Sequence, residues 1–261
     1  MNYYSFARNS VNADIYLGQG AGKKLLNDME NAKKFIKIIS PYHSTNYLEL
    51  LILLQEKGID ISLITSEEIK DYKEASKGTL KTKLIKQEKT VNEKERKKHI
   101  VISKISKFSI LGFVLSILII FGLGWKISEA YFQGLYISIG LMAIGTIFFF
   151  WSTNIKVNTY AYKELFPFRV FDSPHKLNYS HSGAFHIHSK VYIIDDEIAY
   201  MGSINLTSSG LGNSFESRIR IIDKDVISGL NEMFEKLFNH TDNIFLDNIA
   251  WGKQAYAEPL N

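Results

Sequence analysis

Two long apolar runs interrupt the chain and limit what it can fold into. Residues 108–125 are 18 consecutive residues without a charged side chain, and residues 131–151 are 21 more. A helix needs about 20 residues to cross the hydrocarbon core of a bilayer. Trp125, Tyr131 and Trp151 lie at the ends of these runs, where interfacial aromatic side chains are common. The pattern predicts two membrane-spanning helices.

Only residues 126–130 separate the two runs, so the helices must form an antiparallel hairpin with both flanks on one side of the membrane. Two buried helices in a soluble core are the alternative, which the lack of a polar face disfavours. Gly112 and Ser116 give the first helix a small-residue surface for contact with the second.

Basic side chains concentrate in the segment before the hairpin. Residues 70–107 contain 13 Lys or Arg and 5 Asp or Glu, a net charge of +8, whereas the whole chain carries +4. The positive-inside rule then predicts a two-pass protein of the inner, cytoplasmic membrane with both flanks in the cytoplasm. The absence of a signal-peptide pattern and of cysteine agrees with this location. The segment itself is a solvated stalk or a site for anionic lipid or nucleic-acid phosphates.

Strand and helix patterns alternate on both sides of the hairpin. Before it, helical patterns over residues 21–34 and 46–57 alternate with strand patterns over residues 35–40 and 59–65, which predicts a parallel strand pair with a right-handed crossover. After it, strands are expected over residues 184–195 and 198–201 and from Glu216, followed by an amphipathic helix over residues 225–238.

The densest chemical pattern lies in residues 188–205. It consists of His188-x-Lys190, four residues, Asp195, six residues, and Gly202-Ser203-x-Asn205. The pattern resembles the signature of the phospholipase D superfamily of phosphodiesterases at every fixed position, and residues 12–65 resemble the amino-terminal half of that fold more loosely. The resemblance implies an α/β fold, a phospholipase D-like mixed sheet flanked by helices, here interrupted by the transmembrane hairpin.

Strand periodicity places His188 and Lys190 on one face, about 7 Å apart and within reach of one phosphate. Asp195 falls on the other face, so we expect it to support the site from a distance. The resemblance implies that His188 attacks phosphorus to form a phosphohistidine while Lys190 and Asn205 stabilise the phosphoryl oxygens. It also implies a second histidine as proton donor and a carboxylate, here Glu216, that orients the nucleophile.

Three further positions complete the expected site. Gly202 and Ser203 allow the backbone to approach a phosphate, and Arg218 either contacts substrate phosphates or forms a structural pair with Arg220. His186 with His188 could be read as a metal pair, but the neighbouring Lys190 disfavours a cation there, so neither a metal nor another cofactor is expected.

The superfamily reaction needs two such motifs, and this chain has one. A homodimer with a shared site supplies the second motif, whereas the alternative is an inactive monomer.

The sequence predicts five segments. They are residues 1–68 and 152–240 for the two halves of the lobe, 69–107 for a basic linker, 108–151 for the hairpin and 241–261 for a tail. The expected function is a membrane-anchored phosphodiesterase, nuclease-like. A phospholipase D or phosphatidyltransferase that acts on membrane phospholipid and a catalytically inactive effector are the alternatives.

Overall fold

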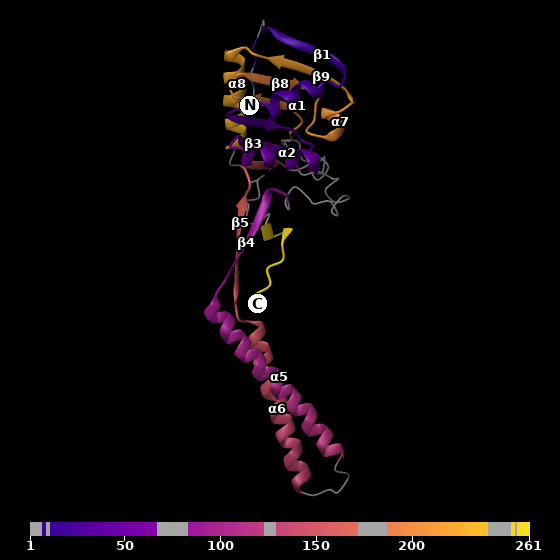
Figure 1. The fold of residues 1–261 in the computed structure, drawn as a ribbon, viewed down its shortest axis with the longest axis vertical. Coiled ribbons are helices and arrows are strands. Elements are labelled where there is room, and N and C mark those ends of the chain that lie inside the picture. Colours follow the sequence, from indigo (N-terminus) through magenta and orange to yellow (C-terminus); the bar gives the residue numbers. More distant parts are fainter. Residues whose placement is uncertain are drawn as a thin grey trace, which may run out of the picture. The chain divides into compact units, whose positions relative to one another are not determined.

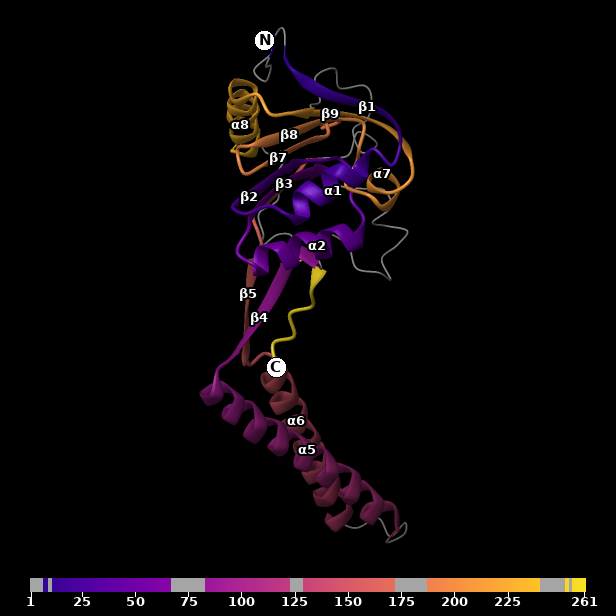
Figure 2. The same cartoon turned by 45° about the horizontal axis from the view of Figure 1, so that its top comes forward.

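The computed structural model describes residues 7–8, 11–66, 83–122, 129–171, 187–239, 252–253 and 255–261 (Figures 1 and 2). They divide into two compact units. The sheet unit comprises Met1–Lys86 and Tyr162–Tyr256, and the hairpin unit comprises Gln87–Ala161 and Ala257–Asn261. Each unit is described by itself below.

The sheet unit is built on a seven-stranded mixed sheet in the order β1-β9-β8-β7-β2-β3-β6. Strands β2, β3 and β6 run parallel to one another, and the remaining neighbours are antiparallel. The strands are β1 (Ala13–Gln19), β2 (Phe35–Ile39), β3 (Asp60–Ser66), β6 (Phe168–Phe171), β7 (Val191–Ile194), β8 (Ile198–Gly202) and β9 (Phe215–Ile221). The helices are α1 (Gly22–Glu30), α2 (Thr45–Glu56), α7 (Ser208–Leu211) and α8 (Lys224–Phe238).

Helices cover both faces of the sheet, and the side chains of strand β7 are buried against them on both faces. All four of its residues are buried, and they alternate between two apolar clusters. Tyr192 and Ile194 pack in the cluster that contains α1 and α2, whereas Val191 and Ile193 pack in the cluster that contains α8. A strand buried on both faces belongs to the centre of a layered α/β fold, so the predicted mixed sheet flanked by helices is confirmed.

Local signals set the ends of several elements. The Asp223 carboxylate accepts hydrogen bonds from the first backbone N–H groups of α8, and Thr207 does the same for α7. After α2, Gly58 adopts a positive φ of 90° that suits glycine and turns the chain into β3. The predicted parallel pair is formed by β2 and β3, with Phe35 opposite Asp60.

The strand predicted over residues 184–195 is wrong in its first half. Strand β7 begins only at Val191, and residues 187–190 lie outside it, while residues 184–186 fall outside the described ranges. The ladder ends here because Val191 pairs with Ile39, the last residue of β2, and with Met201 near the end of β8. Residues before Val191 therefore leave the sheet at this edge.

The hairpin unit contains α5 (Glu93–Gly122) and α6 (Glu129–Thr153). The Ser106 hydroxyl donates to the backbone carbonyl of Gly145 at 2.9 Å, and the Ser116 and Ser138 hydroxyls lie 2.7 Å apart. Small side chains thus hold the two helices together, as expected for close helix packing in lipid. Helix α5 begins at Glu93, so it includes the end of the segment predicted as a linker.

Both helices are long and apolar enough to cross a membrane, over Glu93–Ile120 and Phe132–Thr153. Only 11% of the residues in each apolar window are buried, which differs from the core helices of a soluble protein. Two polar strands, β4 (Ile85–Val91) and β5 (Asn158–Glu164), pair as a separate ribbon. The chain end lies along this unit, where the Leu260 carbonyl accepts from the N–H groups of Val157 and Asn158.

Candidate active site

The residues of the predicted motif lie at one end of the sheet, where β2 and β8 end and β7 and β9 begin. His188 and Lys190 directly precede β7, and Ser203 and Asn205 directly follow β8. Glu216 is the second residue of β9. Because β2 and β3 are parallel, this is also the edge at which their carboxyl ends meet, which is where open α/β sheets bind ligands.

Lys190 and His188 are in direct contact. The Lys190 ammonium donates to the backbone carbonyl of His188 at 2.7 Å and lies 3.4 Å from His188 Nδ1. Lys190 is 8% exposed, whereas the side chain of His188 is exposed. Burial lowers the pKa of the Lys190 ammonium below its ordinary value, and the negative charge of Glu216 opposes this shift. A partly dehydrated cation therefore lies beside an accessible imidazole.

Glu216 is bonded to the segment that follows β8. The Ser203 hydroxyl donates a hydrogen bond to the Glu216 carboxylate and accepts from the backbone N–H of Ser217 at 2.9 Å. We predicted that the Glu216 carboxylate would bind His188. Among the described residues, its side-chain hydrogen-bond partner is Ser203 instead. The orienting role of Glu216 toward His188 stays a prediction, while the structure links Ser203 and Glu216.

Position 202 must be glycine because the backbone of the neighbouring strand β9 lies too close for a side chain. A Cβ atom at this position would overlap the backbone carbonyl of Ser217, and its φ is +155°. The close approach of β8 to β9 therefore excludes any side chain. Since Ser203 N–H also donates to the Ser217 carbonyl at 3.1 Å, the same contact fixes where the Ser203 hydroxyl lies.

Asn205 presents a polar atom without a partner. Its Oδ1 atom is buried and makes no hydrogen bond within the part of the chain that the structure describes. Buried polar atoms are normally paired, so this amide oxygen is available to accept a hydrogen bond from a donor group of a ligand, whereas a phosphate oxygen would be held by the Nδ2 amide of the same side chain.

Asp195 lies away from the other motif residues, separated from Lys190 by the whole of β7. Its carboxylate accepts three backbone hydrogen bonds, from Lys33, Lys34 and Phe35, at 2.7–3.0 Å. Asp195 and Asp196 both have a φ of 56°, in a tight turn closed by the Glu197 N–H on the Ile194 carbonyl. The geometry gives Asp195 a structural task, the attachment of the β7–β8 turn to the start of β2.

Comparison with known families decides the assignment. Residues 151–238, which include every residue of this edge from His188 to Glu216, match the family model described as "Cardiolipin synthase, PLD-like domain". Residues 151–238 thus match a phospholipase D-like domain.

Three solved structures are similar to the chain at low identity. NucT from Helicobacter pylori has a TM-score of 0.41 and 12% identity, covering 86% of this chain and 94% of that one. Nuc from Salmonella typhimurium, described as a phospholipase D family member, has a TM-score of 0.39 and 12% identity, covering 87% and 95%. The phosphatidylserine synthase of Haemophilus influenzae has a TM-score of 0.40 and 12% identity, covering 91% and 41%. No curated protein matches the chain significantly.

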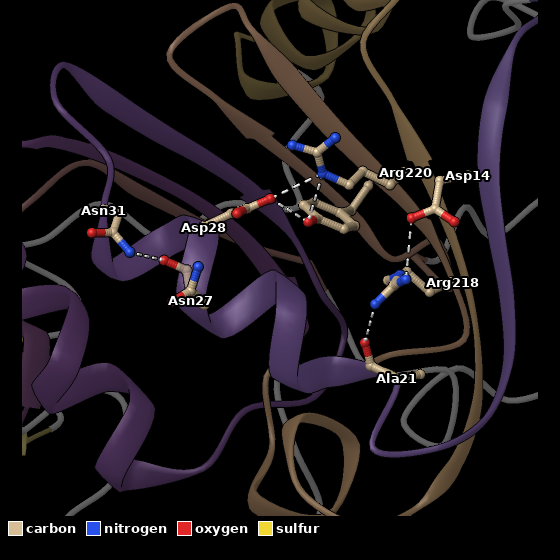
Figure 3. A network of polar contacts seen from close by, with 8 residues as sticks. Asp14, Ala21, Asn27, Asp28, Asn31, Arg218 and Arg220 are labelled. Carbon is tan, nitrogen blue, oxygen red and sulfur yellow. Dashed lines mark hydrogen bonds and ion pairs between the residues drawn. The ribbon is translucent and has the colours of Figure 1, made fainter.

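Arg218 and Arg220, two positions of β9 near the phospholipase D motif, form structural contacts (Figure 3). Arg218 is buried, and its guanidinium donates to Asp14 and to the carbonyl of Ala21, both at 3.3 Å. Arg220 donates to Asp28 (Figure 3). It also donates to the hydroxyl of Tyr200, which itself donates to Asp28. A contact between Arg218 and a substrate phosphate stays a prediction.

Three residues that contact the segment after β8 were not predicted from the sequence. One lies on β7, and two lie in the segment that follows β2. Tyr192, Ser40 and His43 are all buried beside the residues that follow β8. Burial lowers the pKa of the His43 imidazole to about 4, and its Nδ1 lies 3.2 Å from the Thr65 hydroxyl. No group of three or more His, Cys, Asp or Glu that could hold a metal occurs among the described residues, and His186 lies outside them.

Proposed function

We propose that the chain is a membrane-anchored phosphodiesterase that works as a homodimer through a phosphohistidine intermediate. The observation that carries the proposal is the contact of Lys190 with His188, next to Ser203, Asn205 and Glu216 at the carboxyl edge of the sheet. A buried cation beside an exposed imidazole is the arrangement needed to hold a phosphate oxygen while the ring attacks phosphorus.

The two chemical steps follow from these side chains. In the first, the unprotonated His188 forms a bond to phosphorus, and the bond to the leaving oxygen breaks as that oxygen takes a proton from a second histidine. In the second, this histidine takes a proton from water, whose oxygen displaces His188 from phosphorus. Lys190 and the Asn205 side chain stabilise the negative charge on the phosphoryl oxygens in both steps.

The second histidine comes from a second copy of the chain. His43 is the other histidine near this edge within the described ranges, and a pKa of about 4 keeps it neutral at physiological pH, so it cannot donate the proton. A twofold dimer supplies His188 of the partner subunit instead, with the two imidazoles exchanging the roles of nucleophile and acid.

Two observations support attachment to the inner, cytoplasmic membrane. Helices α5 and α6 have the length and composition of spanning helices, and Ser116 and Ser138 join them through hydroxyl groups rather than through a large apolar core. The basic residues on the first turns of α5 favour a cytoplasmic position for both flanks and for the sheet unit.

We propose nucleic acid as the first substrate to test, because one motif in a short lobe is sufficient for a dimeric nuclease and the segment before the hairpin carries a net charge of +8. Phospholipid is the second candidate. It is favoured by the apolar hairpin and by the phospholipid-synthesising enzyme that gives the matched family model its description.

The test presents the detergent-solubilised full chain with labelled DNA, RNA and phospholipid in EDTA. Wild type is compared with His188→Ala and with Lys236→Ala, an exposed lysine that pairs with Glu232. Cleavage of nucleic acid that only His188→Ala abolishes supports the nuclease assignment, and release or exchange of a lipid headgroup supports the phospholipase alternative. Turnover of none of the substrates would leave an inactive, membrane-bound effector.

A further inference from the structure

The loop that carries Asn205 is held by hydrogen bonds on both sides of that residue. On one side, the Tyr192 hydroxyl donates to the backbone carbonyl of Ile204 at 2.9 Å. On the other, the Leu206 N–H donates to the Ser40 hydroxyl at 3.0 Å. All four of these flanking and supporting residues are buried, with at most 3% of their surface exposed.

A second set of contacts continues the attachment beyond Leu206. The Leu206 carbonyl accepts from the Ser44 N–H at 2.9 Å, and the Ser208 N–H donates to the Ser44 hydroxyl at 3.1 Å. The segment after β2 and the segment after β8 therefore run side by side, with an isolated parallel bridge between His43 and Leu206. Asn205 lies on a segment whose backbone has little freedom to move.

Tyr192 connects this loop to the strand that begins beside the catalytic lysine. It is two residues after Lys190, and it is 1% exposed. Burial raises the pKa of the Tyr192 hydroxyl, a side-chain hydrogen bond with Ser40 opposes this shift, and the negative charge of Glu216 adds to it, so the net shift is upward and the group remains a proton donor. The hydrogen bond to Ile204 thus joins β7, the strand that directly follows Lys190, to the loop that carries Asn205.

We propose that Tyr192 and Ser40 are positioning residues that fix the separation between Lys190 and Asn205, the two groups that hold the phosphoryl oxygens. The inference rests on the proposed function, because it assigns Tyr192 and Ser40 a role through Asn205. Phosphate clamps act only when both donors meet the same group, and small displacements of such groups have large kinetic effects.

Tyr200 provides a matched control for Tyr192. The two tyrosines lie opposite each other in the ladder between β7 and β8, both are 1% exposed, and both pack in the same apolar cluster. Their hydroxyls have different hydrogen-bond partners. Tyr200 donates to Asp28 and accepts from Arg220, and neither residue belongs to the Asn205 loop. Removing either hydroxyl removes a buried hydrogen bond, but only one of them lies next to Asn205.

The experiment measures kcat/KM and the affinity for inorganic phosphate in the full chain. We expect Tyr192→Phe to lower kcat/KM about ten- to a hundredfold and Tyr200→Phe to leave it near the wild-type value, with similar Tm losses in both. The decisive comparison is with Asn205→Ala. If Tyr192 acts through Asn205, Tyr192→Phe should add little further loss of activity or of phosphate affinity in that background.

Ser40→Ala should show the same dependence on Asn205. Full additivity of Tyr192→Phe with Asn205→Ala, or equal losses from Tyr192→Phe and Tyr200→Phe, would overturn the inference while leaving the proposed function intact. A wild-type chain that neither turns over a phosphodiester nor binds phosphate would overturn both.

Discussion

The ammonium group of Lys190 bridges two atoms of His188, its backbone carbonyl at 2.7 Å and its ring Nδ1 at 3.4 Å. The first contact fixes the lysine relative to the backbone, and the second leaves Nε2 as the ring atom free to face a substrate. A substrate phosphate would compete for the same ammonium, because Lys190 is otherwise largely shielded from water. In the proposed mechanism, binding of substrate and release of the imidazole would therefore be coupled through this one cation.

Replacing either member of this pair is expected to abolish turnover. His188→Ala removes the nucleophile and Lys190→Ala removes the phosphate clamp, so each should lower kcat by several orders of magnitude without loss of folding. Steady-state kinetics and circular dichroism in detergent measure the two effects. Lys236→Ala is the matched lysine control. A His188→Ala variant that keeps more than a few per cent of activity would show that another residue attacks phosphorus.

The charge of Glu216 should set the alkaline limit of the enzyme. Lys190 clamps phosphate only when protonated, and its lowered pKa means that the clamp is lost at a lower pH than for an ordinary lysine. Since Glu216 raises that pKa, Glu216→Gln should move the alkaline limb of phosphate affinity to lower pH still. Glu235→Gln, which removes a carboxylate paired with Lys37, serves as control. An unmoved or upward-moved limb would mean that Glu216 does not act on Lys190.

Asp195 should affect stability far more than chemistry. Asp195→Ala leaves three backbone N–H groups without their acceptor, so we expect a loss of about 2 kcal/mol or more in the free energy of unfolding, with kcat of the folded protein nearly unchanged. Asp196→Ala is the matched control. Asp196 shares the φ of 56°, but its carboxylate accepts from one side chain, that of Asn231. Thermal unfolding and kcat should separate the two variants, and a large kcat loss with normal stability in Asp195→Ala would point to a chemical role.

Mixed dimers should reveal whether two copies share one site. If wild-type and His188→Ala subunits exchange freely at equal amounts, about one quarter of the dimers contain both histidines, and activity should fall to that fraction. Gel filtration and cross-linking establish that exchange has occurred. Activity near one half would instead mean that each subunit works alone.

Both flanks of the hairpin should face the cytoplasm. The native chain has no cysteine, so a single cysteine reports its own location. A cysteine at Ser128, between the two apolar runs, should react with a membrane-impermeant reagent in intact cells, whereas one at Glu56, exposed at the end of α2, should not. The reverse pattern would place the sheet unit outside the cell and favour phospholipid over nucleic acid.

Sequence periodicity was sufficient for the elements with a strongly apolar face. Strands β2, β3 and β8 and helices α2 and α8 lie within a few residues of the expected ranges. It failed at β4 and β5, because strands such as Ile85–Val91 carry mostly polar, exposed side chains and gain their pairing from one partner strand. It also extended β7 too far. Ile187 packs in the same apolar cluster as Val191 and Ile193, so the alternation continues although the backbone has left the ladder.

The site shows the same division between local and long-range information. Spacing along the chain predicts His188, Lys190, Ser203 and Asn205 as site residues, because that motif is contiguous in sequence, and the resemblance adds Glu216. The bond from Ser203 to Glu216 and the support from Tyr192 and Ser40 depend on the register between strands, which no local pattern encodes.

The position of the hairpin within the sheet has a consequence for the order in which the protein is made. Strand β3 ends at Ser66 and pairs with β6, which begins at Phe168, and β2 pairs with β7, which begins at Val191. During synthesis, β2 and β3 can pair with each other, but the outer edge of each strand has no partner yet. The partner strands β6 and β7 follow only after residues 67–167, which include both apolar helices. Long-range pairing of this kind is slow and exposes strand edges to aggregation. Both helices are therefore synthesised before the sheet can close, so a ribosome that stalls within the hairpin leaves the first half of the sheet unit without its central strand β7 and without His188.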